Sequence, residues 1–250
     1  MDFHCHIDLY PNPREVYRET IERNEFTWLV TTSPRAFAAT SKALASSPGV
    51  LITPGLHPEL AHERAAELPL LLEQIRRARA VGEVGLDGSA RFKAHLNTQT
   101  RIFEAVIEEC AVLGGRILNI HSRQAVKQVL AVLKAHPGYG TAVLHWFSGT
   151  TAELKAAMDE GCWFSVGPAM LATAGGQRLV AMMPGDRVVP ASDGPFANVA
   201  GRPIMPWEPL HWPSWPAALA PVSSNPGRSS LGMVFKTRLK PADSGRLATT

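Results

Sequence analysis

The stretch Arg79–Gly88, RAVGEVGLDG, decides both the fold and the candidate chemistry of this 250-residue chain. Ala80, Val81 and Val84 form an apolar run typical of a buried strand, and the glycines keep the backbone thin where the strand ends. Glu83 lies inside this apolar run. Because a carboxylate is costly to bury without a partner, we expect Glu83 to face a cation or a metal ion.

Short apolar runs of the same kind alternate with helical patterns along the rest of the chain. Apolar side chains at spacings of three and four predict the helices, and Pro69 should kink or split the third of them. The predicted strands are 2–7, 27–31, 50–55, 80–86, 116–121, 141–145, 162–166 and 187–193. The predicted helices are 13–23, 34–45, 63–77, 96–113, 124–134, 152–160 and 176–182.

This order of elements predicts an α/β fold of the (β/α)8 TIM-barrel type, whose usual length is about 250 residues. The active site of such a barrel forms at the carboxyl ends of the strands, which is where the polar candidates lie. An open, doubly wound sheet is the alternative. It would place its site at one switch point and leave the other strand ends without catalytic groups.

The composition changes after the last predicted strand. Seven prolines lie between Pro203 and Pro226, a density that forbids a long helix there, so no eighth helix is predicted. We therefore divide the chain into a barrel, 1–208, and a Pro- and Ser-rich tail, 209–250. The tail is expected to be poorly ordered, or else docked on the barrel through its tryptophans. A shift of reading frame after codon 208 is a further hypothesis, which resequencing would test.

Charge and cysteine content limit the function classes. Residues 1–200 carry 19 Lys and Arg against 20 Asp and Glu, so the pI near 8.9 is no evidence that the barrel binds nucleic acid. The three cysteines have no paired spacing, which is typical of a reducing compartment. Neither a secretory leader nor an apolar run of about 18 residues is visible. We expect a cytoplasmic protein with no membrane partner.

Histidines and carboxylates recur at the ends of the predicted strands. His4 and His6 share one face of the first strand, with Cys5 on the other face, and two such imidazoles can bind one metal ion. This pair alone is a weak signal. The joint pattern is stronger, because further candidates end the later strands: Glu83, His121, His145 and Asp193, with His57 after the third strand.

Six segments in this order resemble the TatD family of metal-dependent DNases, which are amidohydrolase-like barrels. The segments are DFHCHID (2–8), GLHP (55–58), GEVGLD (82–87), NIHSR (119–123), LHWFSG (144–149) and SDGPF (192–196). The resemblance implies a two-metal phosphodiesterase that acts on DNA, at single strands or ends. The opening MDFHCHIDLYP and the SDGPF segment resemble QatD, the TatD-like component of the Qat anti-phage system, which would add other Qat proteins as partners.

The resemblance also implies roles for individual residues. Two divalent ions would be bound, one by His4, His6 and Asp193 and the other by His121 and His145, with Glu83 bridging them. The ions are expected to be Zn²⁺, Mg²⁺ or Mn²⁺, since imidazoles favour the first and carboxylates the other two. Glu83 and Asp193 would be catalytic, with Asp193 also accepting the proton of the attacking water.

Each of four other kinds of residue in these segments has two alternative expected roles. His57 would orient the substrate phosphate or act as an outer metal ligand. Arg123 would contact a phosphate or lie solvated at a helix start. Trp146 and Phe147 would stack on a base or pack under a loop. Asp87 would orient a metal ligand or cap the turn that follows it.

Two other hypotheses stay open at this point. One is an amidohydrolase or phosphotriesterase acting on a small molecule, but many of these have a carboxylated lysine as the bridging ligand, where this chain has Glu83. The other is a non-catalytic barrel subunit of a defence complex. This sequence also departs from the TatD pattern, which usually has an acidic residue two positions before the last-strand aspartate, because that position here is Ala191.

Overall fold

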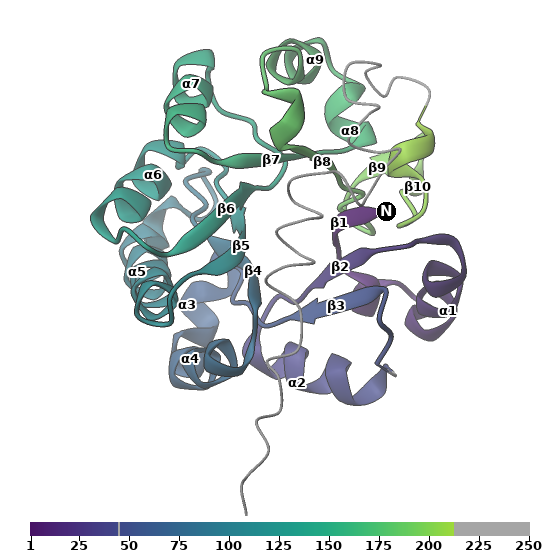
Figure 1. Cartoon of the computed structure of the whole chain (residues 1–250), viewed down its shortest axis with the longest axis horizontal. Coiled ribbons are helices and arrows are strands. Elements are labelled where there is room, and N and C mark those ends of the chain that lie inside the picture. Colours follow the sequence, from purple (N-terminus) through teal and green to yellow (C-terminus); the bar gives the residue numbers. More distant parts are fainter. Residues whose placement is uncertain (45, 213–250) are drawn as a thin grey trace, which may run out of the picture.

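A computed structural model describes residues 1–44 and 46–212, and its strands form a closed barrel (Figure 1). A three-stranded parallel sheet contains β1 (Asp2–Cys5), β2 (Thr27–Val30) and β3 (Val50–Thr53), in that order. A five-stranded parallel sheet follows in chain order: β4 (Ala80–Gly85), β5 (Arg116–His121), β6 (Gly140–Leu144), β7 (Trp163–Val166) and β8 (Val188–Pro190).

Backbone hydrogen bonds close both seams between the two sheets. At one seam the N–H of Glu83 donates to the carbonyl of Thr31, at 3.3 Å. At the other, the N–H of His6 donates to the carbonyl of Gly194, at 2.8 Å. Because the first and last strands are joined in this way, the predicted barrel is confirmed, and the alternative of an open sheet is wrong.

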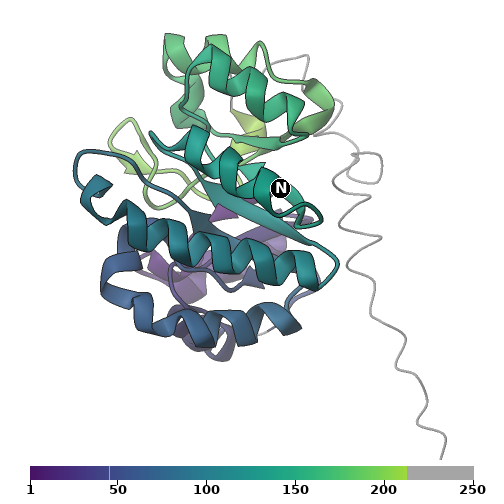
Figure 2. The same cartoon turned by 90° about the vertical axis from the view of Figure 1, so that its left-hand side faces the viewer.

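Helices cover the outside of the barrel, as the side view shows (Figure 2). They are α1 (Pro13–Arg23), α2 (Pro34–Ala43), α3 (Ala61–Arg64), α4 (Leu68–Arg77), α5 (Leu96–Val112), α6 (Val126–Ala135), α7 (Thr151–Asp159), α8 (Pro168–Leu171) and α9 (Ala174–Val180). Pro69 lies in the first turn of α4, where its missing N–H is no loss. It splits the predicted helix 63–77, as expected.

An apolar cluster fills the part of the barrel nearer the amino ends of its strands. Its buried members come from both sheets: Phe3, Trp28, Val30, Ala80, Ile117, Val143, Trp163 and Val189. Trp28 is fully buried, and its indole N–H donates to the hydroxyl of Thr53, at 2.8 Å. This packed interior supports the polar side chains at the carboxyl ends, as in other barrels of this kind.

After β8 the chain forms a hairpin of β9 (Asn198–Val199) and β10 (Arg202–Pro203), which pair antiparallel. Trp207 then packs beside the cluster that contains Cys5, and the guanidinium of Arg23 lies 4.6 Å above its ring. The proposed boundary at residue 208 stays a prediction, since 213–250 of the predicted tail lie outside the described residues. Within the described part of the chain, every helix is too short or too polar to cross a membrane.

Candidate metal centre and active site

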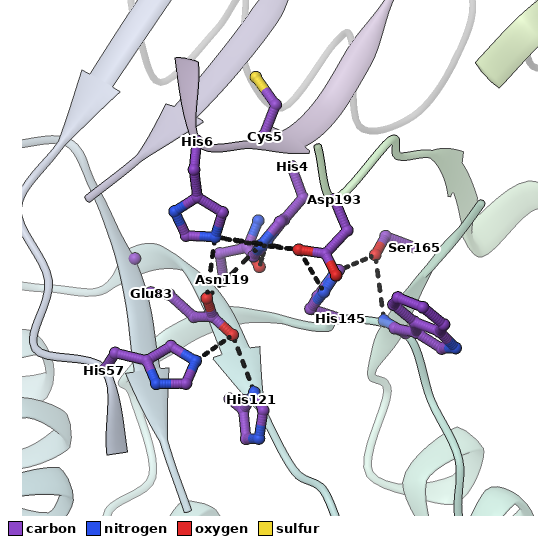
Figure 3. Close-up of polar contacts among 12 residues, drawn as sticks. His4, Cys5, His6, His57, Glu83, Asn119, His121, His145, Ser165 and Asp193 are labelled. Atoms are coloured by element: carbon purple, nitrogen blue, oxygen red, sulfur yellow. Dashed lines mark hydrogen bonds and ion pairs between the residues drawn. The ribbon is translucent and has the colours of Figure 1, made fainter. Parts of the chain in front are cut away.

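Imidazoles from several strands surround Glu83 at the carboxyl end of the barrel (Figure 3). Glu83, in β4, is only 2% exposed. Its Oε2 lies 3.5 Å from Nε2 of His4 and 3.4 Å from Nε2 of His6. Its Oε1 lies 3.0 Å from Nδ1 of His121 and 3.3 Å from Nε2 of His57. The glutamate that interrupts the apolar run therefore has imidazole neighbours on both oxygens.

Asp193, directly after β8, adds a second carboxylate on the side of His4. Its Oδ1 lies 3.4 Å from Nε2 of His4 and 3.5 Å from Nε2 of His145. The rings of His4 and His145 are stacked, with centroids 3.4 Å apart. The resemblance pairs His145 with His121, whereas the structure places it beside His4 and Asp193. We call His4, His6, His145 and Asp193 the inner group, and His57 and His121 the outer group; Glu83 touches both.

Asn119, in β5, determines which nitrogen of His4 carries the ring proton. The Asn119 side-chain N–H donates to the carbonyl of Phe3 at 2.9 Å, so the amide oxygen, 2.8 Å from His4 Nδ1, must accept. His4 Nε2 then faces two carboxylates and Nε2 of His6, which is 3.2 Å away, so a bound cation would take the place of a proton on this nitrogen. Several acceptors pointing at one space fit a bound cation.

The two outer histidines have opposite tautomers. Burial would raise the pKa of Asp87, but its hydrogen bonds with His121 and Ser89 together lower it to about 2, so Asp87 is ionised and accepts from His121 Nε2 at 2.8 Å. Nδ1 of His121 then faces Glu83. Burial would lower the pKa of His121, but Asp87 and Glu83 raise it to about 9, so a bound cation would take the place of the proton on Nδ1. In His57, Nδ1 accepts the backbone N–H of Glu59 at 3.2 Å, so its proton lies on Nε2. His121 therefore offers a metal ligand and His57 a proton donor.

The two carboxylates stay ionised in the buried site. Burial alone would raise the pKa of Glu83, but His57 and His4 hold it well below its usual value. Likewise His145 and His4 keep the pKa of Asp193 low despite its burial. Burial would lower the pKa of His4, yet Glu83 and Asp193 raise it to about 10. Burial and the neighbouring His4 lower the pKa of His145 to about 4. This environment favours positive charge between the carboxylates.

Two glycines in the quoted segments let the strands approach the site closely. A Cβ at Gly55, in GLHP, would lie 2.4 Å from the backbone nitrogen of Glu83. A Cβ at Gly85, in GEVGLD, would lie 2.1 Å from the carbonyl oxygen of His121, and Gly85 has φ +135°. Only glycine fits these positions without moving the ligand-bearing strands.

Ser165, in β7, is a neighbour of His145 that the sequence did not single out. Its Oγ lies 3.1 Å from Nδ1 of His145 and accepts the backbone N–H of Trp146 at 3.4 Å. Ala191, the position at which the TatD resemblance implies an acidic residue, lines the same small hollow beside His145. The hydroxyl of Ser165 therefore contacts the imidazole of His145, and position 191 in the same hollow carries no carboxylate.

Asp2 is a second residue that the sequence did not single out. Its side chain links the first strand of the barrel to the segment that follows the last strand. Its buried carboxylate accepts the backbone N–H of His4 at 3.0 Å. It also accepts the backbone N–H of Ser192 at 3.0 Å and the Ser192 hydroxyl at 2.5 Å. Burial raises the pKa of Asp2 to about 6. The only signal for it in the sequence is a charged residue inside an apolar strand.

The site lies at the bottom of a cavity of about 710 Å³, whose wall includes Arg123 as expected. The apolar part of this wall consists of Leu9, Leu60, Trp146 and Phe196. Phe147, one of the two predicted base contacts, is instead 1% exposed and packs edge-on against Phe164. Trp146 lines the cavity and stays a candidate for stacking on a base. Phe147 packs inside the protein, which was the alternative role expected for it.

A closed (β/α)8 barrel with imidazoles and carboxylates gathered at its strand ends defines a class of barrel proteins with a metal centre at that position. Within this class, the sequence profile of the family described as TatD related DNase matches residues 1–223. The chain therefore belongs to the TatD-related DNase family. The candidate metal-binding groups described above agree with the metal dependence of this family.

Curated relatives match part of the chain. The protein named 3'-5' ssDNA/RNA exonuclease TatD from Erwinia amylovora is 31% identical over 151 residues, which cover 58% of this chain and 58% of the relative. The protein of the same name from Edwardsiella piscicida is 31% identical over 164 residues, covering 62% of this chain and 60% of that relative. The chain thus spans little more than half the length of these relatives.

Solved structures agree with the fold. The TatD homolog YjjV from Escherichia coli K12 superposes with a TM-score of 0.73 at 21% identity, over 83% of this chain and 85% of YjjV. A TatD family hydrolase from Entamoeba histolytica gives a TM-score of 0.62 at 21% identity, over 76% of this chain and 72% of its own. At this identity both comparisons establish the barrel and nothing finer.

Proposed function

We propose that this chain is a metal-dependent phosphodiesterase that hydrolyses DNA at single strands or ends. One observation carries the proposal: imidazole nitrogens and the Asp193 carboxylate converge with Glu83 at the bottom of an open cavity. His4 Nε2 and His121 Nδ1 point into that space, because Asn119 and Asp87 accept hydrogen bonds from the N–H group of the other ring nitrogen. Membership in the family and the names of the curated relatives support nucleic acid as the substrate.

The proposed cofactor is a pair of divalent cations, chosen from Zn²⁺, Mg²⁺ and Mn²⁺. Their ligands would be His4, His6, His145 and Asp193 on the inner side and His121 on the outer side, with Glu83 between. When bound, such ions polarise a phosphoryl group, lower the pKa of water and stabilise the charge on the leaving oxygen. The mixture of imidazole and carboxylate ligands is compatible with each of the three metals.

The other polar residues would orient the substrate and handle protons. Asp193 is ionised and 14% exposed, so its carboxylate would accept the proton of the attacking water. His57, with its proton on Nε2, would donate a hydrogen bond to a phosphate oxygen. Arg123, on the cavity wall, would bind the phosphate with two parallel N–H groups.

The test combines elemental analysis of the purified protein with cleavage of a labelled single-stranded oligonucleotide. We expect bound divalent metal, cleavage that stops with a chelator and recovery when the metal is returned. Asp193→Asn should remove the cleavage, while Glu59→Gln, a carboxylate on the same cavity wall outside both groups, should leave it intact. Cleavage that persists in the chelator would contradict the proposal.

We further propose that the chain acts in the cytoplasm as the nuclease of a Qat-type anti-phage system. The opening residues 1–11 and the SDGPF segment support this choice, and the three cysteines are buried free thiols, as is common in reducing compartments. The test is phage plating with co-purification of the other Qat proteins. Protection should require Glu83; protection that survives Glu83→Gln would indicate a non-catalytic subunit instead.

A further inference from the structure

Phe196 is exposed at the rim of the cavity, directly beside the inner group. It is 59% exposed, and it is the one aromatic side chain among the exposed large apolar residues of the described chain. Its ring meets the ring of His6 edge-on, with centroids 5.1 Å apart. A ring in water at this distance from the candidate metal ligands is within reach of a bound substrate.

The backbone that carries Phe196 is held firmly. The N–H of Ala197 donates to the carbonyl of Asp193 at 2.9 Å, and the N–H of Ile204 donates to the carbonyl of Ala197 at 3.0 Å. On the other side, the N–H of Gly194 donates to the hydroxyl of Ser192 at 3.1 Å. The exposure of the ring is therefore a property of a fixed turn, and a fixed ring loses little entropy when a ligand stacks on it.

The wall of the cavity is poor in cations. Among the described residues that line it, Arg123 is the only lysine or arginine, and Glu59 adds a negative charge. Leu9, which is 42% exposed, and Trp146 contribute apolar surface. Apolar walls do not stabilise a charged phosphodiester group. They do stabilise a nucleobase, since every base presents a face that stacks on aromatic rings.

We propose that Phe196 is the platform on which the base of the terminal nucleotide stacks while its phosphodiester bond lies at the metal centre. This inference rests on the proposed function and assigns a positioning residue to it: the ring on which the unpaired last base of the strand lies. Recognition then depends on one base and about one phosphate contact, at Arg123, instead of a long backbone tract. A base paired inside a duplex cannot reach the ring without leaving its stack.

Because the curated relatives are named 3'-5' exonucleases, the experiment compares two single-stranded oligonucleotides that differ only in whether the 3′-terminal nucleotide carries a base. For the complete strand, Phe196→Ala should lower kcat/KM by about 5- to 100-fold, the range expected for one stacked base. For the abasic strand the same variant should change little, and Phe196→Trp should restore cleavage of the complete strand. Met182→Ala is the matched control, since Met182 is 46% exposed and does not line the cavity.

Equal losses on both strands, or no loss on either, would overturn the stacking role. Binding of a strand ending in 2-aminopurine gives a readout that needs no cleavage: stacking on Phe196 should quench its fluorescence, and Phe196→Ala should abolish the quenching. If the wild-type protein quenches without cleaving, the proposed function fails and the stacking role stands. If it cleaves without quenching, the stacking role fails and the proposed function stands. The salt dependence of binding should be shallow, with a slope near −0.7 for one phosphate contact.

Discussion

The inner and outer groups share Glu83 but differ in their exposure to the cavity. His4 and His6 are 0% and 1% exposed, whereas the side chains of His57 and His121 are each 15% exposed. The inner imidazole of His4 is oriented by a buried amide that has no charge. The outer imidazole of His121 is oriented by a carboxylate. The comparison indicates that the inner imidazoles of His4 and His6 are enclosed by protein, whereas the outer imidazoles and the Asp193 carboxylate face the cavity, where water and substrate enter.

The largest effect is expected from Glu83→Gln, which removes the one group common to both sides. The amide lacks the negative charge that attracts the cations, and its N–H group would point toward the nitrogens that bind them, so both ions should be lost. Activity should fall on the order of 10³-fold or more. Elemental analysis and oligonucleotide cleavage measure this, with Glu59→Gln as the control. If one ion stays at full occupancy in Glu83→Gln, the two groups do not depend on a shared ligand.

The next largest effect is expected from Asn119→Ala, which acts on the inner side alone. Without the amide oxygen, the proton of His4 is no longer held on Nδ1, and the lone pair on Nε2 is lost for part of the time. The affinity of the inner ion should fall by about 10- to 100-fold, as is typical when a residue that orients a metal-binding histidine is removed. Competition with a metal-sensing dye measures it, and Asn198→Ala, on the exposed hairpin, is the matched control.

Asp87→Asn should act on the outer side alone, by about tenfold. The new amide can still accept the N–H of Ser89, as the carboxylate does at 2.8 Å, but its NH₂ group then faces Nε2 of His121. The proton of the His121 imidazole would then move to Nδ1, so this nitrogen could no longer bind the metal ion. The same dye titration should show a weaker second ion and an unchanged first one. Weakening of both ions would mean that the two sides are coupled beyond Glu83.

The smallest effect is expected from Ser165→Ala, which removes one neutral hydrogen bond from His145. A loss of about 0.5–1.5 kcal/mol corresponds to about 2- to 10-fold in metal affinity. Ser165→Thr keeps the hydroxyl and should stay close to wild type. If Ser165→Ala lowers the metal affinity as much as Asn119→Ala does, then metal binding depends on the orientation of His145 as strongly as on that of His4.

The spacing of apolar residues predicted the strands and most helix limits, because burial on one face imposes a period that remains visible in the sequence. Pro69 predicted the split of the third helix, because proline interrupts the hydrogen bonds of a helix. The same reasoning placed Glu83 and the histidines near strand ends. It did not reveal that His145 lies beside His4, since that depends on the stagger of neighbouring strands in the closed barrel. Nor did it reveal Asn119 and Ser165 as partners, because side-chain rotamers decide which buried polar groups meet.

The seam described above gives the candidate metal centre a structural consequence. His4 lies in the three-stranded sheet, His6 directly follows its first strand, and Glu83 lies in the five-stranded sheet. An ion held among them would therefore be a coordination cross-link between the two halves of the barrel. Ligands that bind only the folded state stabilise it by an amount that grows with their concentration. The supply of divalent metal would then govern how long the folded chain survives, as well as how fast it works.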